Sequence, residues 1–434
     1  MNLATVVIGT AVCCLALVVA AQYLIARVPY LAYQLGTPFL KPALGWPSVA
    51  ALALAWVLTL VAAALVAARR APPRQCRLPR YFCPLAVALS AVHLVYALYM
   101  PKSPELERAI VCVDRATGSI EWTSQGMTGP RGTMHSDNSA ATPTPVTDGA
   151  RIFGYFGTVG ILCMDTHGKT LWTSKELPFE SRQGVASSPI LCGGRLVILS
   201  ESQLGGYLGA LDPDTGQLVW KTNRGKPVHS YAGNCRTPSA KVIGGRDTVV
   251  VWGYKDLSGY DAQTGQELWT HEVGDFGSAN NPVASLVSDE RQLYLVGPQK
   301  TMAVDRSKLA EPSTPMAWER KTTEGAQCAS PVLHNGLLFA ISDTGMAYCL
   351  DSASGAVLWR QRWGTQHYAS PVAVGDRIYF CSTRGLTTVV ASDRRYREIA
   401  ENDLDERTYA SFAPADGQLF IRTSQHLYCI REPN

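Results

Sequence analysis

Side chains suited to binding recur in short segments that each precede an apolar run. Imidazole, guanidinium, amide and phenol groups can form hydrogen bonds, and the aromatic rings among them can also stack on a ligand. The candidate residues are His135, Arg182, His229, Tyr231, Arg236, Gln327, His367, Tyr368, Arg407 and Tyr409. Binding residues concentrate on loops held by a rigid framework, so a framework that gathers these segments would create a polar and aromatic binding face. The alternative is that these side chains are solvated and bond to neighbouring turns.

The sequence gives less support for catalysis than for binding. The candidate segments lie far apart along the chain, so the sequence assigns no Ser-His-Asp arrangement and no pair of catalytic carboxylates. No Cys-x-x-Cys-His haem attachment motif occurs, and no spaced set of His and Cys indicates a zinc site. We therefore predict no catalytic residue and no metal ligand.

A repeated sequence motif indicates the elements that would position these segments. Its clearest copy is "LGALDPDTGQLVW" (208–220). It ends at a Trp, and the spacings between successive copies are 50, 48, 49, 49 and 41 residues. The Trp positions are Trp122, Trp172, Trp220, Trp269, Trp318 and Trp359, and the Asp positions are Asp114, Asp165, Asp212, Asp261, Asp305 and Asp351. A period in this range indicates a repeat architecture.

Each unit reads as four short antiparallel strands. In residues 329–359 a Ser-Pro opens one strand, His-Asn-Gly and Asp-Thr-Gly mark two turns, and "AVLW" closes the unit. Short runs of Val, Leu, Ile, Tyr and Phe bounded by Gly and Asp predict a meander, and four strands per 40–50 residues are typical of a propeller blade. Trp220 on the outer strand would then fill the wedge between neighbouring blades.

Seven first strands can be counted, so the prediction is an all-β, seven-bladed β-propeller of four-stranded antiparallel blades over residues 109–434. The last unit ends at "LYCIREPN" with three strands, and residues 110–122 supply a hairpin without a first strand. We expect this hairpin to complete the last blade and close the ring. Eight blades remain possible if residues 106–123 form part of a separate blade.

Four cysteines in the repeats fit a structural role. Cys112, Cys163 and Cys349 each stand two residues before the motif Asp, and Cys429 holds the corresponding place in the last unit. Other units have Ala or Gly there, which predicts a slot for a small buried side chain, and a free Cys behaves as a small hydrophobe. Cys235 and Cys328 lie near the inner edges of non-adjacent blades, so we expect no disulfide between them.

The first quarter of the chain differs from the repeats. Three apolar runs, at about 4–25, 49–68 and 82–100, have the length that spans a bilayer as a helix. They predict a membrane domain with three transmembrane helices (1–101), followed by a linker (102–108). Five Arg in "RRAPPRQCRLPRY" between the second and third runs indicate the cytoplasmic side. The lipid bilayer is thus a predicted partner. The N-terminus would be cytoplasmic and the propeller would face outward, which in a bacterial-type inner membrane means the periplasm.

Charge is uneven along the chain. Residues 1–105 carry eight Lys or Arg and one Glu, a net of +7, so the formal +4 of the whole chain leaves −3 for residues 106–434. A nucleic-acid surface needs clustered Lys and Arg on the folded domain. We therefore expect no nucleic-acid partner.

The repeats resemble those of the quinoprotein-type, PQQ-repeat β-propellers, whose phrase is Ala-x-Asp-x-x-Thr-Gly-x-x-x-Trp. "ALDPDTGQLVW" (210–220) matches at every specified position, and the resemblance covers about 109–431. The second hairpin is one residue short, the fifth carries an insertion at 309–315, and the sixth unit (386–400) lacks both Asp and Trp. We expect altered turns or weaker packing in these units.

The resemblance leaves two main functions open, because fold alone does not choose between them. Some members of this family are dehydrogenases that hold pyrroloquinoline quinone with calcium, and others are cofactor-free scaffolds of outer-membrane assembly. The vicinal Cys pair found in several of the enzymes has no counterpart in the soluble part, since Cys13 and Cys14 lie in the first apolar run. We expect a membrane-anchored scaffold without a cofactor that binds an envelope protein. The alternatives are a membrane-bound PQQ-dependent dehydrogenase of sugars or alcohols and, less favoured, a ligand sensor.

Overall fold

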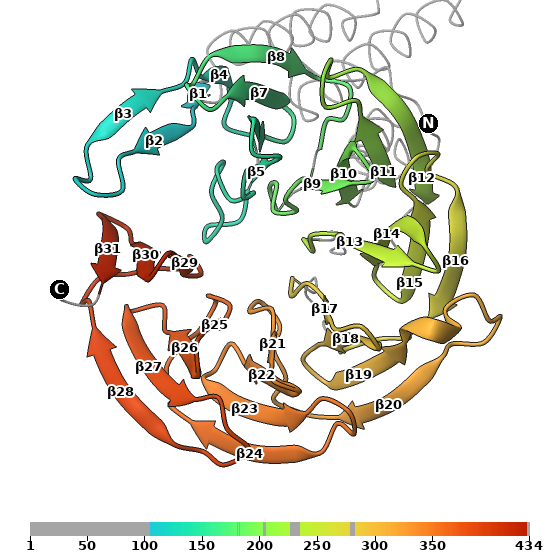
Figure 1. Cartoon of the computed structure of the whole chain (residues 1–434), viewed down its shortest axis with the longest axis vertical. Coiled ribbons are helices and arrows are strands. Elements are labelled where there is room, and N and C mark those ends of the chain that lie inside the picture. The colour runs from blue at the N-terminus through green and yellow to red at the C-terminus, as the bar shows by residue number, and fades with distance from the viewer. Residues whose placement is uncertain are drawn as a thin grey trace, which may run out of the picture. The chain divides into compact units, whose positions relative to one another are not determined.

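The repeats form a ring of antiparallel sheets. The computed structural model describes residues 105–132, 134–179, 181, 183–202, 205–225, 235–277 and 283–431. Within them, seven sheets are arranged like blades around a common axis, in chain order (Figure 1). The predicted seven-bladed, all-β propeller is therefore confirmed. The three predicted membrane segments, at 4–25, 49–68 and 82–100, lie outside the described residues.

Six blades have four strands and the seventh has three. Blade 1 holds β5 (Val146–Thr147), β6 (Arg151–Tyr155), β7 (Ile161–Asp165) and β8 (Thr170–Ser174); blade 2 holds β9 (Ile190–Cys192), β10 (Arg195–Ser202), β11 (Gly205–Leu211) and β12 (Leu218–Gly225). Blade 3 holds β13 (Ser239–Ile243), β14 (Arg246–Trp252), β15 (Asp256–Asp261) and β16 (Glu267–Glu272); blade 4 holds β17 (Val287–Ser288), β18 (Gln292–Val296), β19 (Lys300–Asp305) and β20 (Met316–Lys321). Blade 5 holds β21 (Val332–His334), β22 (Leu337–Ile341), β23 (Met346–Asp351) and β24 (Val357–Arg362); blade 6 holds β25 (Val372–Val374), β26 (Arg377–Cys381), β27 (Leu386–Ala391) and β28 (Glu398–Asp403). Blade 7 holds β29 (Ala413–Ala415), β30 (Gln418–Arg422) and β31 (Leu427–Arg431).

Two strand pairs precede blade 1: β1 (Glu105–Arg108) pairs with β4 (Met127–Pro130), and β2 (Val111–Val113) pairs with β3 (Ile120–Thr123). The described residues also contain a single-turn 3₁₀ helix, η1 (Arg306–Lys308), immediately before the insertion of the fifth hairpin (309–315). No helix in the described ranges is long and apolar enough to cross a bilayer.

The repeated phrase folds as its residue types predict. One carboxylate oxygen of Asp212 accepts hydrogen bonds from the amides of Asp214 (2.9 Å) and Thr215 (3.0 Å). Gly216 follows at φ +70°, a left-handed conformation that glycine adopts without strain. The third and fourth strands then pair with an irregularity at the same place in successive blades, next to the small residue that faces the Trp, as at Ala210 opposite Trp220.

Four of the repeated Trp side chains, Trp172, Trp220, Trp318 and Trp359, donate to a carbonyl in the turn of the following blade. A Cβ built on Gly216 would lie 2.5 Å from the ring of Trp172, so only glycine leaves room for the indole. The indole nitrogen of Trp172 donates to the carbonyl of Pro213 in the same turn, at 3.0 Å. Burial of such a ring between two blades stabilises the structure by about 3 kcal/mol, and the ring connects consecutive blades.

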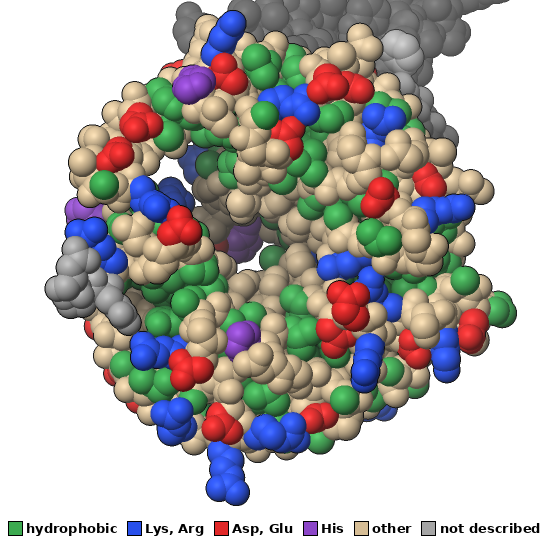
Figure 2. Space-filling view, in the orientation of Figure 1, with side chains coloured by type: hydrophobic (Ala, Val, Ile, Leu, Met, Phe, Trp, Pro, Cys, Tyr) green, Lys and Arg blue, Asp and Glu red, His purple; other side chains and the backbone are tan. Residues whose placement is uncertain are grey.

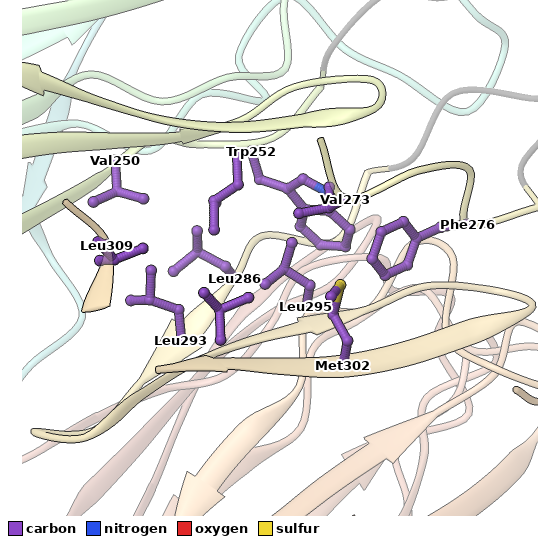
Figure 3. Packing of buried hydrophobic residues seen from close by; sticks show 11 residues of the cluster. Val250, Trp252, Val273, Phe276, Leu286, Leu293, Leu295, Met302 and Leu309 are labelled. Atoms are coloured by element: carbon purple, nitrogen blue, oxygen red, sulfur yellow. The ribbon is translucent and has the colours of Figure 1, made fainter. Parts of the chain in front are cut away.

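The hydrophobic core accordingly lies between blades. Figure 3 shows the gap between blades 3 and 4, where Val250 and Trp252 of one sheet meet Leu293, Leu295 and Met302 of the next. A comparable cluster joins blades 2 and 3 through Trp220.

A chain of hydrogen bonds also joins the first strands near the axis. In each link a backbone amide of one blade donates to a hydroxyl oxygen of the next, at 2.9–3.1 Å. The residues in order are Thr144, Ser188, Thr237, Ser285, Ser330, Ser370 and Ser411. Five of them precede a Pro, as the predicted strand openings suggested. In blade 4 the linking residue is Ser285, three positions after the predicted opening Pro282.

The closure of the ring differs from the prediction. We expected the 110–122 hairpin to complete the last blade, but among the described strands β31 pairs with β30 alone, while β2 and β3 form their own two-stranded sheet. This sheet lies between blade 7 and blade 1 (Figure 1). Trp122 packs on Gly168 of blade 1, and Arg115 forms an ion pair with Asp416 of blade 7 at 2.6 Å. The hairpin therefore closes the ring through side chains, as a partial, separate unit.

The prediction of a buried side chain is wrong for one of the four cysteines, which lies on the open edge of blade 7. Cys163 and Cys349 are fully buried, as predicted, and Cys112 is half-buried, but Cys429 is exposed. Cys429 lies on β31, where the described structure has no fourth strand to cover it. Cys235 and Cys328 are free thiols.

Candidate functional site

Side chains from three loop segments, 134–142, 365–370 and 405–411, lie close together. The segments bring together Asp137, Tyr368, Arg407 and Tyr409, which we call the mouth cluster. The rings of Tyr368 and Tyr409 meet edge to face, with centroids 5.2 Å apart. The guanidinium carbon of Arg407 lies 4.7 Å from the Tyr409 ring centroid, and its Nη2 lies 3.7 Å from Asp137 Oδ1. Three of the ten predicted residues thus lie together.

The mouth cluster is accessible and polarised. The side chain of Arg407 is 64% exposed and donates a hydrogen bond to the hydroxyl of Tyr409, which raises the pKa of Arg407. Gln366 donates to the hydroxyl of Tyr368 at 2.6 Å. Burial, with Cys328 and Asp137 nearby, raises the pKa of Tyr368, so its hydroxyl stays protonated at neutral pH. A fixed cation, two phenols and an amide make this surface suited to a polar or aromatic partner surface.

Two further groups near the cluster were missed as site residues. Cys328 donates its S–H to Asp343 Oδ2 (3.1 Å), and its backbone amide donates to Oδ1 of the same carboxylate (3.0 Å). Burial, followed by the charge of Asp343, raises the pKa of the Cys328 thiol far above its usual value. A nucleophilic cysteine needs a thiolate, so this thiol stabilises the loop rather than offering a reactive group. Asp343 belongs to the Asp-Thr-Gly turn of blade 5, which was predicted only as a turn.

Arg236, predicted as a mouth residue, is buried inside blade 3. Its guanidinium stacks on the Trp252 ring at 3.3 Å and donates to the carbonyls of Gly253 (2.7 Å) and Ala284 (3.1 Å). The side chain is only 1% exposed. Arg236 therefore connects blade 3 to the loop before blade 4 and is not available to a partner.

His367 is likewise structural. The residue is 1% exposed and its Nδ1 lies 2.9 Å from the carbonyl of Thr365, to which it donates. Burial lowers the pKa of His367, so the ring stays neutral at physiological pH. Its backbone amide donates to the carbonyl of Asp343 at 3.2 Å, which ties the 365–370 loop to blade 5. His367 therefore positions Tyr368, the next residue.

The remaining predicted residues divide into two groups. His135 is exposed and its Nδ1 accepts from the amide of Asp137 at 3.2 Å, beside the mouth cluster. The backbone carbonyl of Gln327 accepts from the amides of Val283 and Ala284, so Gln327 holds a loop of blade 4. Arg182, His229 and Tyr231 lie outside the described residues.

The donors that the structure describes are not grouped as pyrroloquinoline quinone with calcium would require. Among the side chains that the structure describes, no three of His, Cys, Asp and Glu gather closely enough to ligate a metal ion. The two cysteines near the channel, Cys235 and Cys328, come from different blades, so they are not a vicinal pair. Arg236, a cation that could face an anionic quinone, is buried against Trp252 and donates to the carbonyls of Gly253 and Ala284. We derive no reaction step through this cofactor.

Comparison with known proteins agrees with the repeats. The family model described as outer membrane protein assembly factor BamB matches residues 107–361. A protein of that name from Alkalilimnicola ehrlichii is 26% identical over 211 residues, which are 46% of this chain and 49% of the relative. The chain thus spans about half the length of this curated relative.

Two solved structures share the architecture. BamB from Moraxella catarrhalis superimposes with a TM-score of 0.55 at 13% identity, covering 76% of this chain and 96% of that one. A europium-containing methanol dehydrogenase superimposes equally well, with a TM-score of 0.55 at 12% identity, covering 73% and 80%. At these identities the likeness shows the fold alone, and it is equal for a protein of the assembly type and for a dehydrogenase.

Proposed function

Because the chain belongs to the family of the outer membrane protein assembly factor BamB, we propose that it is a propeller scaffold that binds protein partners in outer-membrane assembly. The observation that carries this proposal is the family match across residues 107–361, more than half of the chain. The sequence relative from Alkalilimnicola ehrlichii carries the same name and supports it. In this proposal the protein is not an enzyme and needs no cofactor.

The mouth cluster is the proposed contact surface for a partner. Tyr and Arg are enriched among the residues that dominate binding energy at protein interfaces, and Tyr368, Arg407 and Tyr409 lie in contact with one another. The neutral, buried His367 fixes the loop that carries Tyr368. A pre-positioned surface loses little conformational freedom on binding.

We further propose that the propeller is anchored in a bacterial-type inner membrane and faces the periplasm. The three apolar runs at 4–25, 49–68 and 82–100 support the anchor. The Arg-rich stretch between the second and third runs supports a cytoplasmic N-terminus. This placement would bring the mouth cluster to the compartment through which outer-membrane proteins pass.

The test is capture of outer-membrane assembly proteins by the full-length chain carrying a photo-crosslinking amino acid at Tyr368. We expect crosslinks to an assembly component of the same cell, and we expect Arg407→Ala with Tyr409→Ala to reduce them by at least about 10-fold. The matched control is Arg246→Ala, because Arg246 has a similar exposure (58%) and lies at the same distance (3.7 Å) from a carboxylate, Asp261.

An equal loss of crosslinks in the Arg246 control would contradict a specific mouth surface.

The dehydrogenase alternative is tested with the same preparation. If added pyrroloquinoline quinone and calcium were retained through gel filtration and supported dye reduction with an alcohol or sugar, the scaffold proposal would be overturned.

A further inference from the structure

Strand β31 of blade 7 exposes side chains that every complete blade buries. Ile430 is 44% exposed, whereas Leu350, its equivalent on β23 of blade 5, is 1% exposed. Leu427 is 56% exposed, and its equivalent, Ala347, is fully buried. Across the adjoining space, Val111 of the β2–β3 hairpin is 47% exposed. We call the space between β31 and the hairpin turn (114–119) the notch, and Figure 2 shows it as an opening through the ring.

The hairpin turn contains a complete but unfilled site for a Trp ring. Turn glycines Gly168, Gly216, Gly265 and Gly355 each lie against the Trp ring of the preceding blade, within 2.4–2.7 Å of their Cβ positions. Gly118 is the same glycine of the β2–β3 turn, at φ +75°, and no described atom lies within 4 Å of its Cβ position. In the blades the equivalent ring comes from the fourth strand of the preceding blade, and among the described strands blade 7 has only β29, β30 and β31.

The facing strand supplies the other half of the site. In the blades the Trp pairs across from a small residue of the third strand, as Trp172 faces Cys163 and Trp359 faces Cys349. Cys429 holds this position on β31 and is exposed. The carbonyl of the residue after the motif Asp accepts the indole N–H in the blades, as Ser352 accepts from Trp318 at 2.9 Å. Arg115 is the residue that offers this carbonyl in the hairpin turn.

We infer that the notch binds an extended segment of a partner protein, which adds to β31 as an antiparallel fourth strand and places a Trp opposite Cys429. An unpaired strand edge offers a row of backbone donors and acceptors to such a segment. The indole would rest on Gly118 and donate to the carbonyl of Arg115, while apolar residues of the strand would cover Leu427 and Ile430. The occupant is defined by the molecule itself, which fills the same site in its own blades with a Trp-bearing strand.

This inference goes beyond the proposed function, because the notch and the mouth cluster share no residue. A test at the notch does not use Tyr368, Arg407 or Tyr409. Loss of one binding activity therefore leaves the other measurable.

The probe is a synthetic peptide copying residues 354–362, "SGAVLWRQR", which forms the fourth strand of blade 5. The full-length chain is purified in mild detergent, and peptide binding is followed by fluorescence anisotropy and by hydrogen exchange of the β31 amides. We expect saturable binding with slower exchange in β31. We expect about 10-fold weaker binding when the peptide carries Trp359→Ala, because the ring supplies most of the buried apolar area.

Two protein variants test the two halves of the site. Cys429→Phe fills the small slot and should weaken binding at least about 10-fold, whereas Cys429→Ala keeps a small residue, as at Ala210, and should change it less than about 3-fold. Gly118→Asn places a side chain under the incoming ring and should also weaken binding, since Asn tolerates positive φ. The matched control is Gly375→Asn, another positive-φ glycine with open space around it, at φ +59°.

Three outcomes would overturn the inference. The first is equal binding of the Trp and Ala peptides. The second is a concentration-dependent dimer that Cys429→Phe abolishes, which would assign the notch to a second copy of the chain. The third is slow exchange of the β31 amides and no peptide binding in the full-length chain alone, which would show that its own residues already cover the edge.

Discussion

Blades 5 and 7 have third strands that share the same apolar pattern around Tyr-Cys, "AYCL" at 347–350 and "LYCI" at 427–430, yet their side chains differ in exposure. In blade 5 the fourth strand β24 covers β23, and Trp359 reaches the turn of blade 6, where its indole nitrogen donates to the carbonyl of Asp393 at 3.2 Å. In blade 7 β31 pairs with β30 alone among the described strands. An identical repeat pattern thus gives a buried strand or an exposed edge, depending on whether the next strand is present.

The comparison predicts its largest effect at the Trp ring of blade 5, which has no counterpart among the described residues of blade 7. Trp359 is buried against Phe339 (centroids 6.0 Å apart) and Tyr396 (5.3 Å). Trp359→Ala should lower the free energy of unfolding by about 3–5 kcal/mol, because it removes a buried aromatic ring between two blades. Urea unfolding followed by circular dichroism measures the change. A loss below about 1 kcal/mol would contradict the wedge role of these residues.

A matched pair of aliphatic substitutions compares the two strands directly. Leu350→Ala should cost about 2–5 kcal/mol of unfolding free energy because its side chain is buried between blades 4 and 5. Ile430→Ala should cost less than about 1 kcal/mol because Ile430 is 44% exposed and leaves a smaller cavity when truncated. The same unfolding assay compares both variants. Equal costs would indicate that β31 is covered in the full-length chain.

The thiol reactivities of Cys349 and Cys429 compare the same two strands. Burial raises the pKa of Cys349 to about 12, so it should react slowly with a thiol reagent at pH 8. Cys429 is exposed and should react at least about 100-fold faster. Mass spectrometry of the labelled, folded protein measures both rates. Comparable rates at the two cysteines would mean that blade 5 opens as readily as the free edge.

The smallest predicted effect is the contribution of Glu406, in the loop before blade 7, to the pH dependence of stability. Glu406 accepts hydrogen bonds from the hydroxyls of Thr423 (2.5 Å) and Tyr428 (2.6 Å), and His426 Nδ1 lies 2.7 Å from it. These contacts, with that of Thr423 the largest, lower the pKa of Glu406 from 4.5 to about 2. The folded state therefore favours the ionised carboxylate, and this contribution is complete above the unfolded-state pKa.

As pH falls from about 4.5 toward 2, the contribution of Glu406 is lost. Glu406→Gln should consequently reduce the difference in urea midpoint between pH 6 and pH 3 relative to the unmodified protein. Thr322→Ala, a polar change on the loop after blade 4, serves as a control that should leave this difference unchanged. An unaltered pH dependence in Glu406→Gln would show that the contacts of Glu406 contribute nothing to folding.

The residues that carry local rules were predictable from the sequence. Asp212, Gly216 and Trp220 specify a turn, a positive φ and an inter-blade contact within nine residues, and the ring follows from repetition of that phrase. The chain of Ser and Thr hydroxyls was not anticipated, because each link joins residues about 40–49 positions apart. Only the Pro that follows most of these residues marked their position.

The candidate site was predictable only in part. Tyr368, Arg407 and Tyr409 do meet, but Arg236 and His367 come from the same kind of segment and point into the protein. The burial of Arg236 depends on its contact with Trp252, and that of His367 on its contact with Thr365. The folded loops set both contacts. The exposure of Cys429 was unpredictable for a similar reason, since its local sequence is that of a buried strand.

The hydroxyl chain near the axis has a consequence for how such rings change in size. Every link uses an amide of one unit and a hydroxyl of the unit that follows, always in the same direction. A duplicated unit inserted anywhere in the series would therefore bring both groups with it and restore the connections on each side. Whole blades could therefore be gained or lost without breaking this chain of hydrogen bonds. The number of blades is then limited by the angle at which neighbouring sheets pack around the Trp rings between them.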